Sequence, residues 1–356
     1  MRGKDAIQLS LYGLSHAIVD TISIGVLFSI WQGGVIETAE AGWLLLLYNL
    51  LAFGVQPILG LIVDWSQRPR AAAFVGCLLV AAATAGNEGW PRVAVCLAGV
   101  GNGVFHLGAG SICLNLTPGR ATAPGFFVAP GAVGVFAGTY LGLAGSFMAW
   151  PFVLALTLIC ACLVMIPPPR IPPPVKEPEA VSFPVSIPVV LILACIGIRS
   201  LVGSGVELPW KDEFSLAFGL VVLVVIGKAL GGVLADWLGW GRVAIGALAV
   251  ATPLLAFGAA NAGAGLTGTF LVNLSMPVTL AAIANLLPGR PAFAFGLTCL
   301  ALEIGTLPVT LPVEEADVFG RPWIVFATMS VAAIALYIGL RLAFQRWPAR
   351  FADVHE

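Results

Sequence analysis

A few ionisable side chains lie inside long apolar segments of this chain, and these are the residues that could do chemistry. His16 and Asp20 stand four positions apart in the first apolar segment, so on a helix both project from one face. His106, Arg199 and Glu303 each lie well inside later apolar segments. An ionisable group is costly at the centre of a bilayer, so one that persists there is a candidate for function.

Protons are the first chemistry that these residues suggest. The Asp20 carboxyl group could take up and release a proton, and His16 or His106 could share it, because imidazole titrates near neutral pH. Glu303 could be a second proton-coupling group. The alternative is structural: Asp20 could pair with a histidine or with Arg199 only to hold helices together, and Glu303 could likewise pair with a basic residue.

Substrate contact is the second chemistry. Arg199 stays charged and cannot easily relay protons, but its forked donors fit a carboxylate or phosphate group. We expect it to contact substrate or, alternatively, to pair with an acidic side chain inside the membrane. Asn102, His106 and Asn273 are further polar candidates for substrate contact. Phe105 could contact an apolar substrate, although core packing is the competing interpretation.

The composition places the whole chain in a membrane. Of 356 residues, 59% are hydrophobic and 10% charged, which is more apolar surface than a soluble domain of this size can bury. A net charge of −1 excludes a polybasic nucleic-acid binder. The seven cysteines lie in apolar segments without metal-ligand spacing. No enzyme motif is present, and we expect no metal and no cofactor.

An all-α protein with twelve spans is predicted, because a bilayer needs about 20 apolar residues per helix. The connections between the spans are short. The spans are expected at about 7–32, 41–63, 71–86, 92–114, 121–143, 147–166, 186–208, 214–235, 242–260, 264–287, 291–312 and 322–344.

Two patterns repeat along the chain and divide it into halves. Asn-Leu-x-Pro-Gly-Arg occurs at 115–120 and, 170 residues later, at 285–290. Gly-x-x-x-Asp with following arginines also occurs twice, the aspartates being Asp64 and Asp236, 172 residues apart. Nearly equal offsets in one orientation indicate a parallel repeat of homologous halves. We expect six-helix bundles at 1–166 and 186–356, joined by a cytoplasmic proline-rich linker at 167–185.

The basic residues predict the orientation in the membrane, because cytoplasmic loops collect lysine and arginine. If both termini are cytoplasmic, twelve basic residues fall inside and only Arg92, Lys211 and Arg321 fall outside. We therefore expect an inner-membrane protein with both termini in the cytoplasm.

The six-plus-six repeat, with its Gly-x-x-x-Asp motifs after the second and eighth spans, resembles the major facilitator superfamily over nearly the whole chain. Local sequences are similar to the fosmidomycin-resistance-type branch of that superfamily. These are Leu14-Ser-His16-Ala-Ile-Val-Asp20, Phe105-His106, Gly131-x-x-Gly134-x-x-x-Gly138 and Met276-Pro-Val-Thr279. The chain departs from the branch at Leu107, which replaces a proline, at Thr139, where antiporters often carry proline, and at Asn285, which replaces an acidic residue.

The resemblance implies alternating access, with the first, fourth, seventh and tenth spans lining a central cavity. Asp20, His106, Arg199 and Asn273 put one polar group on each of these spans. The resemblance also implies that the duplicated motif is a latch between the halves, a simple loop cap being the alternative. The latch residues would be Gly60, Asp64, Arg68, Arg70, Gly232, Asp236 and Arg242.

A secondary active transporter for a small molecule is the function that these expectations favour. A proton antiporter that exports a small amphiphile or organic anion comes first, on the resemblance. A proton symporter or uniporter for an anionic solute is the alternative, because Arg199 favours anions. A transporter-shaped sensor or assembly factor is a rival of another class, whose buried charges would neutralise one another. We expect a monomer whose partners are substrate, protons and the lipid bilayer.

Overall fold

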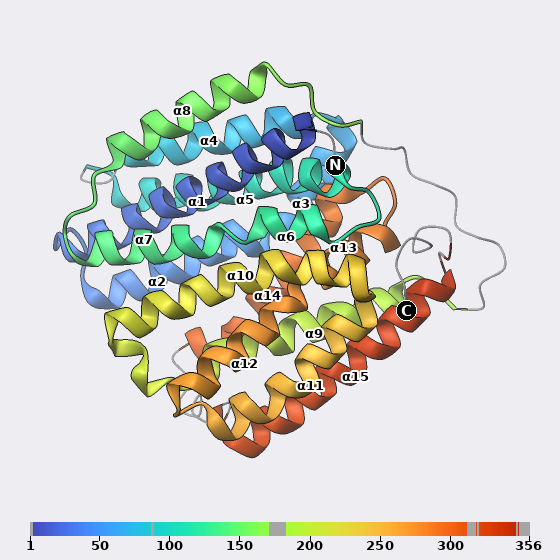
Figure 1. Ribbon diagram of the computed structural model, residues 1–356. Coiled ribbons are helices and arrows are strands. Elements are labelled where there is room, and N and C mark those ends of the chain that lie inside the picture. Colours follow the sequence, from blue (N-terminus) through green and yellow to red (C-terminus); the bar gives the residue numbers. More distant parts are fainter. Residues whose placement is uncertain are drawn as a thin grey trace. The chain divides into compact units, whose positions relative to one another are not determined.

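The structure, a computed structural model, describes residues 3–86, 89–170, 183–311, 318, 320–346 and 348, and this part of the chain is helical and without strands (Figure 1). Within these described residues, ten helical stretches are long and apolar enough to cross a membrane. Two shorter apolar helices, Pro69–Ala85 and Ala149–Val164, stand where the third and sixth spans are expected. The predicted all-helical membrane fold is therefore confirmed, and the chain is an integral membrane protein.

The helices group into two compact units, which are described separately. Unit 1 comprises Met1–Leu116, Pro130–Ile171 and Arg290–Gly296, and unit 2 comprises Thr117–Ala129, Pro172–Gly289 and Leu297–Glu356. Each unit thus contains a short segment from the other half of the sequence. Of the expected linker at 167–185, residues 171–182 lie outside the part of the chain that the structure describes.

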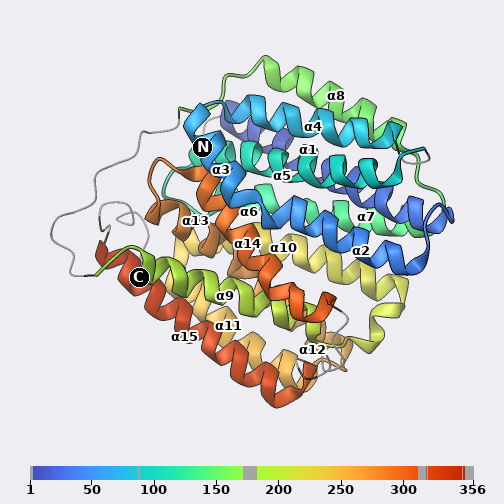
Figure 2. The same cartoon turned by 180° about the vertical axis from the view of Figure 1, so that it is seen from behind.

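Unit 1 holds most of the N-terminal helices. They are α1 (Gly3–Gln32), α2 (Thr38–Asn49), the π-helical turn η1 (Leu50–Gly54), α3 (Gln56–Ser66), α4 (Pro69–Ala85), α5 (Pro91–Leu116), α7 (Gly131–Leu143) and α8 (Ala149–Val164). α1 packs against α5, α7 and α8, and α4 packs along α5 (Figure 2). Small residues allow these close approaches: a Cβ atom on Gly101 of α5 would lie 2.8 Å from the backbone nitrogen of Val80 of α4.

Unit 2 holds the remaining helices. They are α6 (Thr122–Val128), α9 (Ser186–Gly205), the 3₁₀ turn η2 (Pro209–Asp212), α10 (Phe214–Leu238), α11 (Trp240–Gly258), α12 (Ala262–Leu274), α13 (Met276–Leu286) and α15 (Pro322–Arg346). α14 (Pro291–Thr310) begins with the segment counted to unit 1 and continues with residues of unit 2.

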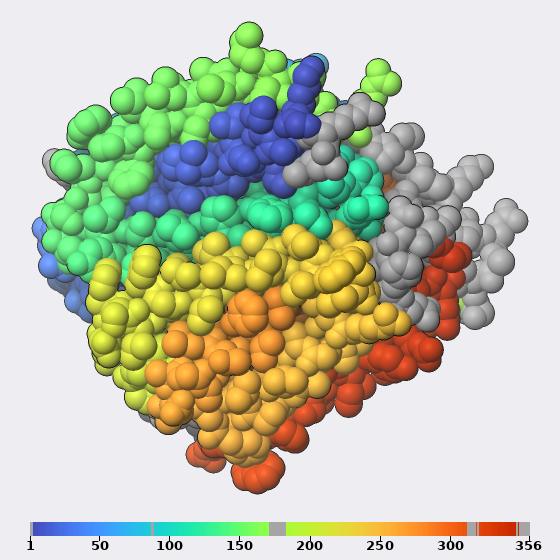
Figure 3. Space-filling view, viewed as in Figure 1, coloured from blue at the N-terminus to red at the C-terminus, as the bar shows by residue number. Residues whose placement is uncertain are grey.

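The helix α10 shows why the surface of unit 2 fits a bilayer rather than water. Its buried residues are small, namely Gly227, Gly231, Gly232 and Ala235. Large apolar side chains on the same helix, such as Phe218 and Trp237, are exposed. The yellow and orange side chains of α10, α11 and α12 form a continuous surface in Figure 3. This arrangement, with small residues inside and large apolar ones outside, is that of a helix facing lipid.

Prolines interrupt three of the predicted spans. The stretch Thr38–Ser66 contains the π-helical turn η1, which ends at Gly54, shortly before Pro57. Thr122–Leu143 is divided near Pro130 into α6 and α7, and Ala262–Leu286 is divided just before Pro277 into α12 and α13. Proline has no backbone N–H and its ring crowds the preceding turn, so the regular helical bonding is lost at each of these points.

The repeated Pro-Gly-Arg sequences form equivalent turns. Gly119 and Gly289 both have a positive φ, 81° and 77°, which glycine adopts without steric cost. The first turn directly precedes α6 and the second directly precedes α14. The duplicated sequence thus marks the start of one helix in each half of the chain.

Candidate functional site

Four polar side chains from two helices of unit 1 meet in a buried cluster. His16 and Asp20 come from α1, and Asn102 and His106 come from α5; each is at most 7% exposed. The Nε2 atom of His16 lies 3.2 Å from Oδ2 of Asp20, and Nε2 of His106 lies 3.9 Å from Oδ1. Asn102 donates from Nδ2 to Oδ1 of Asp20 over 2.8 Å. The cluster therefore surrounds one carboxylate with two imidazoles and one amide.

The hydrogen bonds restrict where protons can sit on the two histidines. Nδ1 of His106 lies 2.8 Å from the carbonyl oxygen of Asn102, which can only accept, so this nitrogen carries a proton. Nε2 of His106 lies 2.7 Å from Nε2 of His16, and one of these nitrogens must donate to the other. With His106 neutral, the donor is His16; with His106 doubly protonated, the donor is His106. A proton added to Nε2 of His106 therefore requires Nε2 of His16 to be unprotonated, so His16 then has no proton facing Oδ2 of Asp20. With Asp20 ionised, this added proton makes the net charge of the cluster zero.

Glycines of α7 bring that helix against the face of α1 that carries the cluster. A Cβ atom on Gly131 would lie 2.9 Å from Oδ2 of Asp20, and one on Gly134 would lie 2.8 Å from Cβ of Asp20. The ring of Phe105 stands edge-on to His106, with ring centroids 5.6 Å apart, and is 1% exposed. The backbone of α7 thus lies against Asp20, and an aromatic ring lies beside His106. This burial strengthens the interaction of the carboxylate with any nearby proton.

The same cluster offers a set of donors to a metal ion. One donor atom from each of His16, Asp20 and His106 lies within 4.8 Å of the others. Two imidazole nitrogens and a carboxylate suit a divalent transition metal. The sequence did not lead us to expect this possibility, because the histidines come from helices 90 residues apart along the chain.

In unit 2, Arg199 of α9 reaches the junction between α12 and α13. Its side chain is 6% exposed and donates to the hydroxyl of Ser275 and, over 3.3 Å, to that of Thr279. Its Nε atom is buried and makes no hydrogen bond, and no carboxylate of the described chain lies within 4.0 Å of the guanidinium. Arg199 is therefore a buried cation that is held by neutral groups.

The other candidates of unit 2 stand apart from Arg199. Asn273 donates to the carbonyl oxygen of Thr269 in its own helix and makes no hydrogen bond to the arginine. Glu303 of α14 is 5% exposed, and its Oε1 atom has no hydrogen-bond partner. No ion pair to Glu303 occurs among the described residues. Among the described residues, neither Arg199 nor Glu303 forms an ion pair.

The duplicated aspartates both bind the start of a helix. Asp64 accepts from the backbone nitrogens of Ala292 and Phe293, over 3.0 and 2.8 Å, at the start of α14. Asp236 accepts from those of Ala121 and Thr122, over 2.8 and 2.9 Å, at the start of α6. Each carboxylate thus caps the helix that follows the Pro-Gly-Arg turn from the other half of the sequence, where the helix dipole favours a negative charge.

The glycine of each motif makes this approach possible. A Cβ atom on Gly60 would lie 2.7 Å from the carbonyl oxygen of Ala292, and one on Gly232 would lie 2.8 Å from the carbonyl carbon of Ala121. Any larger side chain would push the capped helix away from the carboxylate. Glycine and aspartate therefore act together in both copies.

The arginines of the motifs do not take part in the caps. Arg68 is exposed, Arg70 donates to the carbonyl oxygen of Ile166, and Arg242 donates to that of Leu238, in each case over 3.3 Å. The aspartates of the predicted latch bind the backbone of a helix start directly, whereas its arginines make no such contact within the described part of the chain. Backbone N–H groups at a helix start leave no acceptor that an arginine could bind.

Several partners in these sites were missed by the sequence analysis. Ser275 and Thr279 hold Arg199, and Thr122 and Trp240 donate to Asp236. Trp240 stands four residues after Asp236 but begins the next helix, α11, after a break at Gly239, so the spacing of four gave no same-face signal. Ser275 carried no such signal, because only tertiary packing places it beside α9.

Comparison with solved structures reveals the fold. The fucose:proton symporter FucP of E. coli, in a single-residue variant, is similar with a TM-score of 0.65 and 15% identity over 97% of this chain and 99% of that chain. A major facilitator superfamily transporter, FucP, in the outward conformation gives 0.68 and 15% over 95% and 98%. The human organic anion transporter MFSD10 (TETRAN) gives 0.68 and 13% over 96% and 100%.

Sequence comparison adds no closer relative, since no protein-family profile and no curated protein matches the chain. The structural likeness nevertheless covers nearly the full length of all three transporters. The chain therefore has the fold of the major facilitator transporters.

Proposed function

We propose that the protein is a secondary transporter that works by alternating access and couples transport to protons through Asp20, His16 and His106. The observation that carries the proposal is the contact of these three titratable groups in one buried cluster. The fold supports transport in general, because the similar structures are transporters. The coupling ion and the direction of transport rest on the cluster and on the resemblance seen in the sequence.

The physical basis of coupling is the cost of a buried charge. With neutral histidines the cluster carries the negative charge of Asp20, and one added proton on the histidine pair neutralises it. A neutral cluster is easier to keep away from water than a charged one. Two conformations that differ in the hydration of this cluster would therefore bind the proton with different affinity, and a proton gradient could shift the balance between them.

Arg199 defines the solute that fits this transporter. A buried guanidinium without a carboxylate partner is costly, and an anionic group on the substrate would supply the missing charge. We therefore propose a solute that carries a carboxylate or phosphate group. The absence of an ionic partner for Arg199 among the described residues also argues against a transporter-shaped sensor whose buried charges cancel.

Export by proton antiport is our first choice of direction, on the resemblance to the fosmidomycin-resistance-type branch. Symport of an anion with a proton is the second candidate, and Arg199 favours it because a proton taken up by the cluster would travel with the negative charge of the solute. A similar structure is that of a fucose:proton symporter. The two candidates move protons in opposite directions, so one measurement separates them.

The test uses purified protein in liposomes that contain a pH-sensitive dye. A panel of carboxylates and organic phosphates is added outside, and the internal pH is followed. Entry of the solute by symport should acidify the interior, and entry by antiport should make it alkaline. We expect Asp20→Asn to lower this proton movement at least about tenfold, since a positioned acid or base contributes a factor of that order or more where a step requires proton transfer.

The matched control is Asp5→Asn, which removes a carboxylate near the start of the same helix and should leave the proton movement unchanged. A wild-type signal from Asp20→Asn would refute the coupling role. The assay is repeated with a chelator of divalent metals. A signal that disappears with the chelator and returns with Zn²⁺ would assign the donor set of the cluster to a metal instead.

A further inference from the structure

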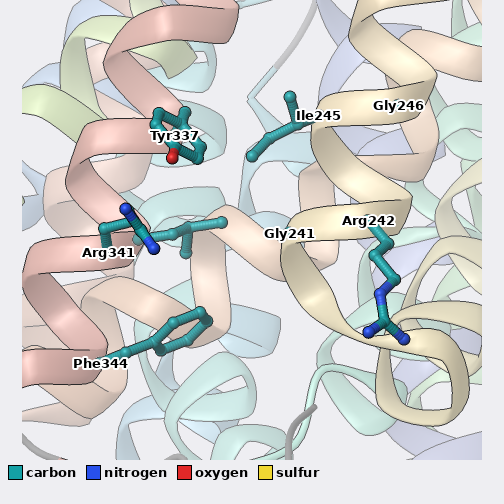
Figure 4. A pocket seen from close by; sticks show the side chains of 8 residues that line it. Gly241, Arg242, Ile245, Gly246, Tyr337, Arg341 and Phe344 are labelled. Carbon is teal, nitrogen blue, oxygen red and sulfur yellow. The ribbon is translucent and has the colours of Figure 1, made fainter. Parts of the chain in front are cut away.

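A groove of about 540 Å³ runs in unit 2 between the start of α11 and the end of α15. Figure 4 shows Tyr337 and Phe344 of α15 pointing toward α11, with Arg341 between them along the helix. Ile245 points back from α11, whereas the side chain of Arg242 lies on the side of α11 away from Arg341. The lining residues are Gly241, Arg242, Ile245 and Gly246 of α11 and Tyr337, Leu340, Arg341 and Phe344 of α15.

The charge of this groove is positive, and no described acidic residue forms an ion pair with it. Two arginines line it, and none of the lining residues is acidic. Arg242 uses one nitrogen to donate to the carbonyl oxygen of Leu238, over 3.3 Å. Arg341 lies over the ring of Tyr337, 5.5 Å from its centroid. No carboxylate of the described chain lies within 4.0 Å of either guanidinium, so most of their donors are free to bind an anion.

The position of the arginines matches the headgroup level of a membrane. Arg242 is the third residue of α11, and Arg341 stands five residues before the end of α15. Both lie near the ends of helices that are long enough to cross a bilayer. An arginine at such a place reaches the layer of lipid phosphates, whichever side of the membrane this end faces.

The remaining walls of the groove match an acyl chain. Ile245, Leu340 and Phe344 give it an apolar surface, and Gly241 and Gly246 leave room where side chains would otherwise fill it. Tyr337 is 46% exposed, with its ring in the groove and its hydroxyl able to reach a polar headgroup. A soluble anion would use the arginines and leave these apolar walls without a partner.

We propose that this groove binds an anionic phospholipid, with its phosphate attracted by the charges of Arg341 on one wall and Arg242 on the other, and an acyl chain along Ile245, Leu340 and Phe344. The site lies outside the proton cluster and does not depend on it. It also gives a role to Arg242, which the sequence repeat assigned to the latch and which the structure keeps out of the Asp236 cap. The lipid would brace α11 against α15.

The test compares lipids on the full-length protein in mild detergent. Native mass spectrometry measures retention of phosphatidylglycerol and phosphatidylcholine, and thermal melting measures their stabilising effect. Each arginine near the lipid phosphates should contribute about fivefold to affinity, so the double variant Arg242→Gln with Arg341→Gln should bind phosphatidylglycerol about 30-fold more weakly. Binding of phosphatidylcholine should change less.

The charge-matched control is Arg120→Gln with Arg170→Gln, which removes two exposed arginines outside the groove and should leave lipid binding unchanged. Inorganic phosphate and glycerol phosphate are added as a separate arm and should give no stabilisation. Stabilisation by these soluble anions would mean that the groove binds a small anion and not a lipid. Equal retention of phosphatidylglycerol by the groove variant and the control variant would refute the proposed lipid site. A melting transition measured without lipid confirms that both variants fold.

Discussion

At the scale of the residue, Arg199 and Asp20 are buried in different ways. Asp20 is surrounded by groups that can supply a proton or a hydrogen bond. Arg199 donates to hydroxyl groups, which lower the free-energy cost of burying its charge but do not neutralise the charge. A structural ion pair would neutralise both charges permanently. We therefore propose that the carboxylate binds a proton and that the guanidinium binds an anion.

Replacement of Arg199 by glutamine should weaken binding of an anionic solute by about 10- to 100-fold, because a hydrogen bond to a charged group is worth about 1.5–3 kcal/mol. The affinity of Arg199→Lys for the solute should lie between those of the wild type and Arg199→Gln, since lysine keeps the positive charge but not the two parallel donors of the guanidinium. The melting temperature of Arg199→Gln should stay equal or rise, because no carboxylate loses its partner. Solute affinity is measured by titration calorimetry and stability by thermal melting.

The matched control for this prediction is Arg92→Gln. Arg92 forms an exposed ion pair with Glu40, over 2.7 Å, and exposed pairs of this kind contribute little. Neither affinity nor melting should change appreciably in that variant. A large loss of stability in Arg199→Gln, with affinity preserved, would show that the arginine serves only to hold helices together.

At the scale of the element, the two Gly-x-x-x-Asp motifs build one device twice. In each copy a glycine allows a helix start to approach, and an aspartate then accepts from two of its backbone N–H groups. The capped helices follow the duplicated Pro-Gly-Arg turns. We propose that these caps are the latch implied by the resemblance, so that their release accompanies the change of conformation.

Asp64→Asn and Asp236→Asn should each loosen one helix start without affecting the other. Asparagine keeps one acceptor oxygen but replaces the second with an amide that cannot accept, and the charge at the helix start is lost. Loss of such a cap costs about 0.5–2 kcal/mol. Hydrogen exchange followed by mass spectrometry should show faster exchange at 291–296 in Asp64→Asn and at 121–128 in Asp236→Asn.

Asp212→Asn is the control for both caps, because Asp212 is exposed in a short turn. It should change exchange in neither segment. If exchange at the helix starts were the same in the cap variants as in this control, the two carboxylates would not stabilise these helix starts. The proposal that the caps form the latch would then be wrong.

At the scale of the whole molecule, an even number of crossings puts both termini on one side of the membrane. Ten long apolar stretches and two shorter apolar helices account for the twelve expected spans. The basic residues favour the cytoplasm for the two ends. Fusions of green fluorescent protein, which folds only inside, should therefore fluoresce at the C-terminus, and alkaline phosphatase should be active when inserted after Gly145.

The complementary inserts are the control for this topology. Phosphatase inserted after Gln67, between α3 and α4, should be inactive, because the predicted topology places this connection in the cytoplasm. Active phosphatase at both positions would mean that the short helix Pro69–Ala85, which lies between the two insertion points, does not cross the membrane. The count of twelve spans would then be wrong.

The sequence by itself determined the class of protein, the order of the spans and the residues with unusual chemistry. Hydropathy carries this information locally, since a run of about 20 apolar residues is a span whatever surrounds it. The nearly equal offsets of the two repeated motifs predicted two similar halves. The pair of His16 and Asp20 was visible because a spacing of four along one helix fixes a common face.

Only the tertiary structure decided which of these residues meet. Asn102 binds Asp20, and His106 reaches His16, because α1 and α5 pack with particular rotations that no spacing along a single helix can give. The caps of Asp64 and Asp236 join segments 228 and 115 residues apart. Contacts between helices depend on how side chains and glycines fit across their interface, and that fit is a property of the packed helices together rather than of either sequence alone.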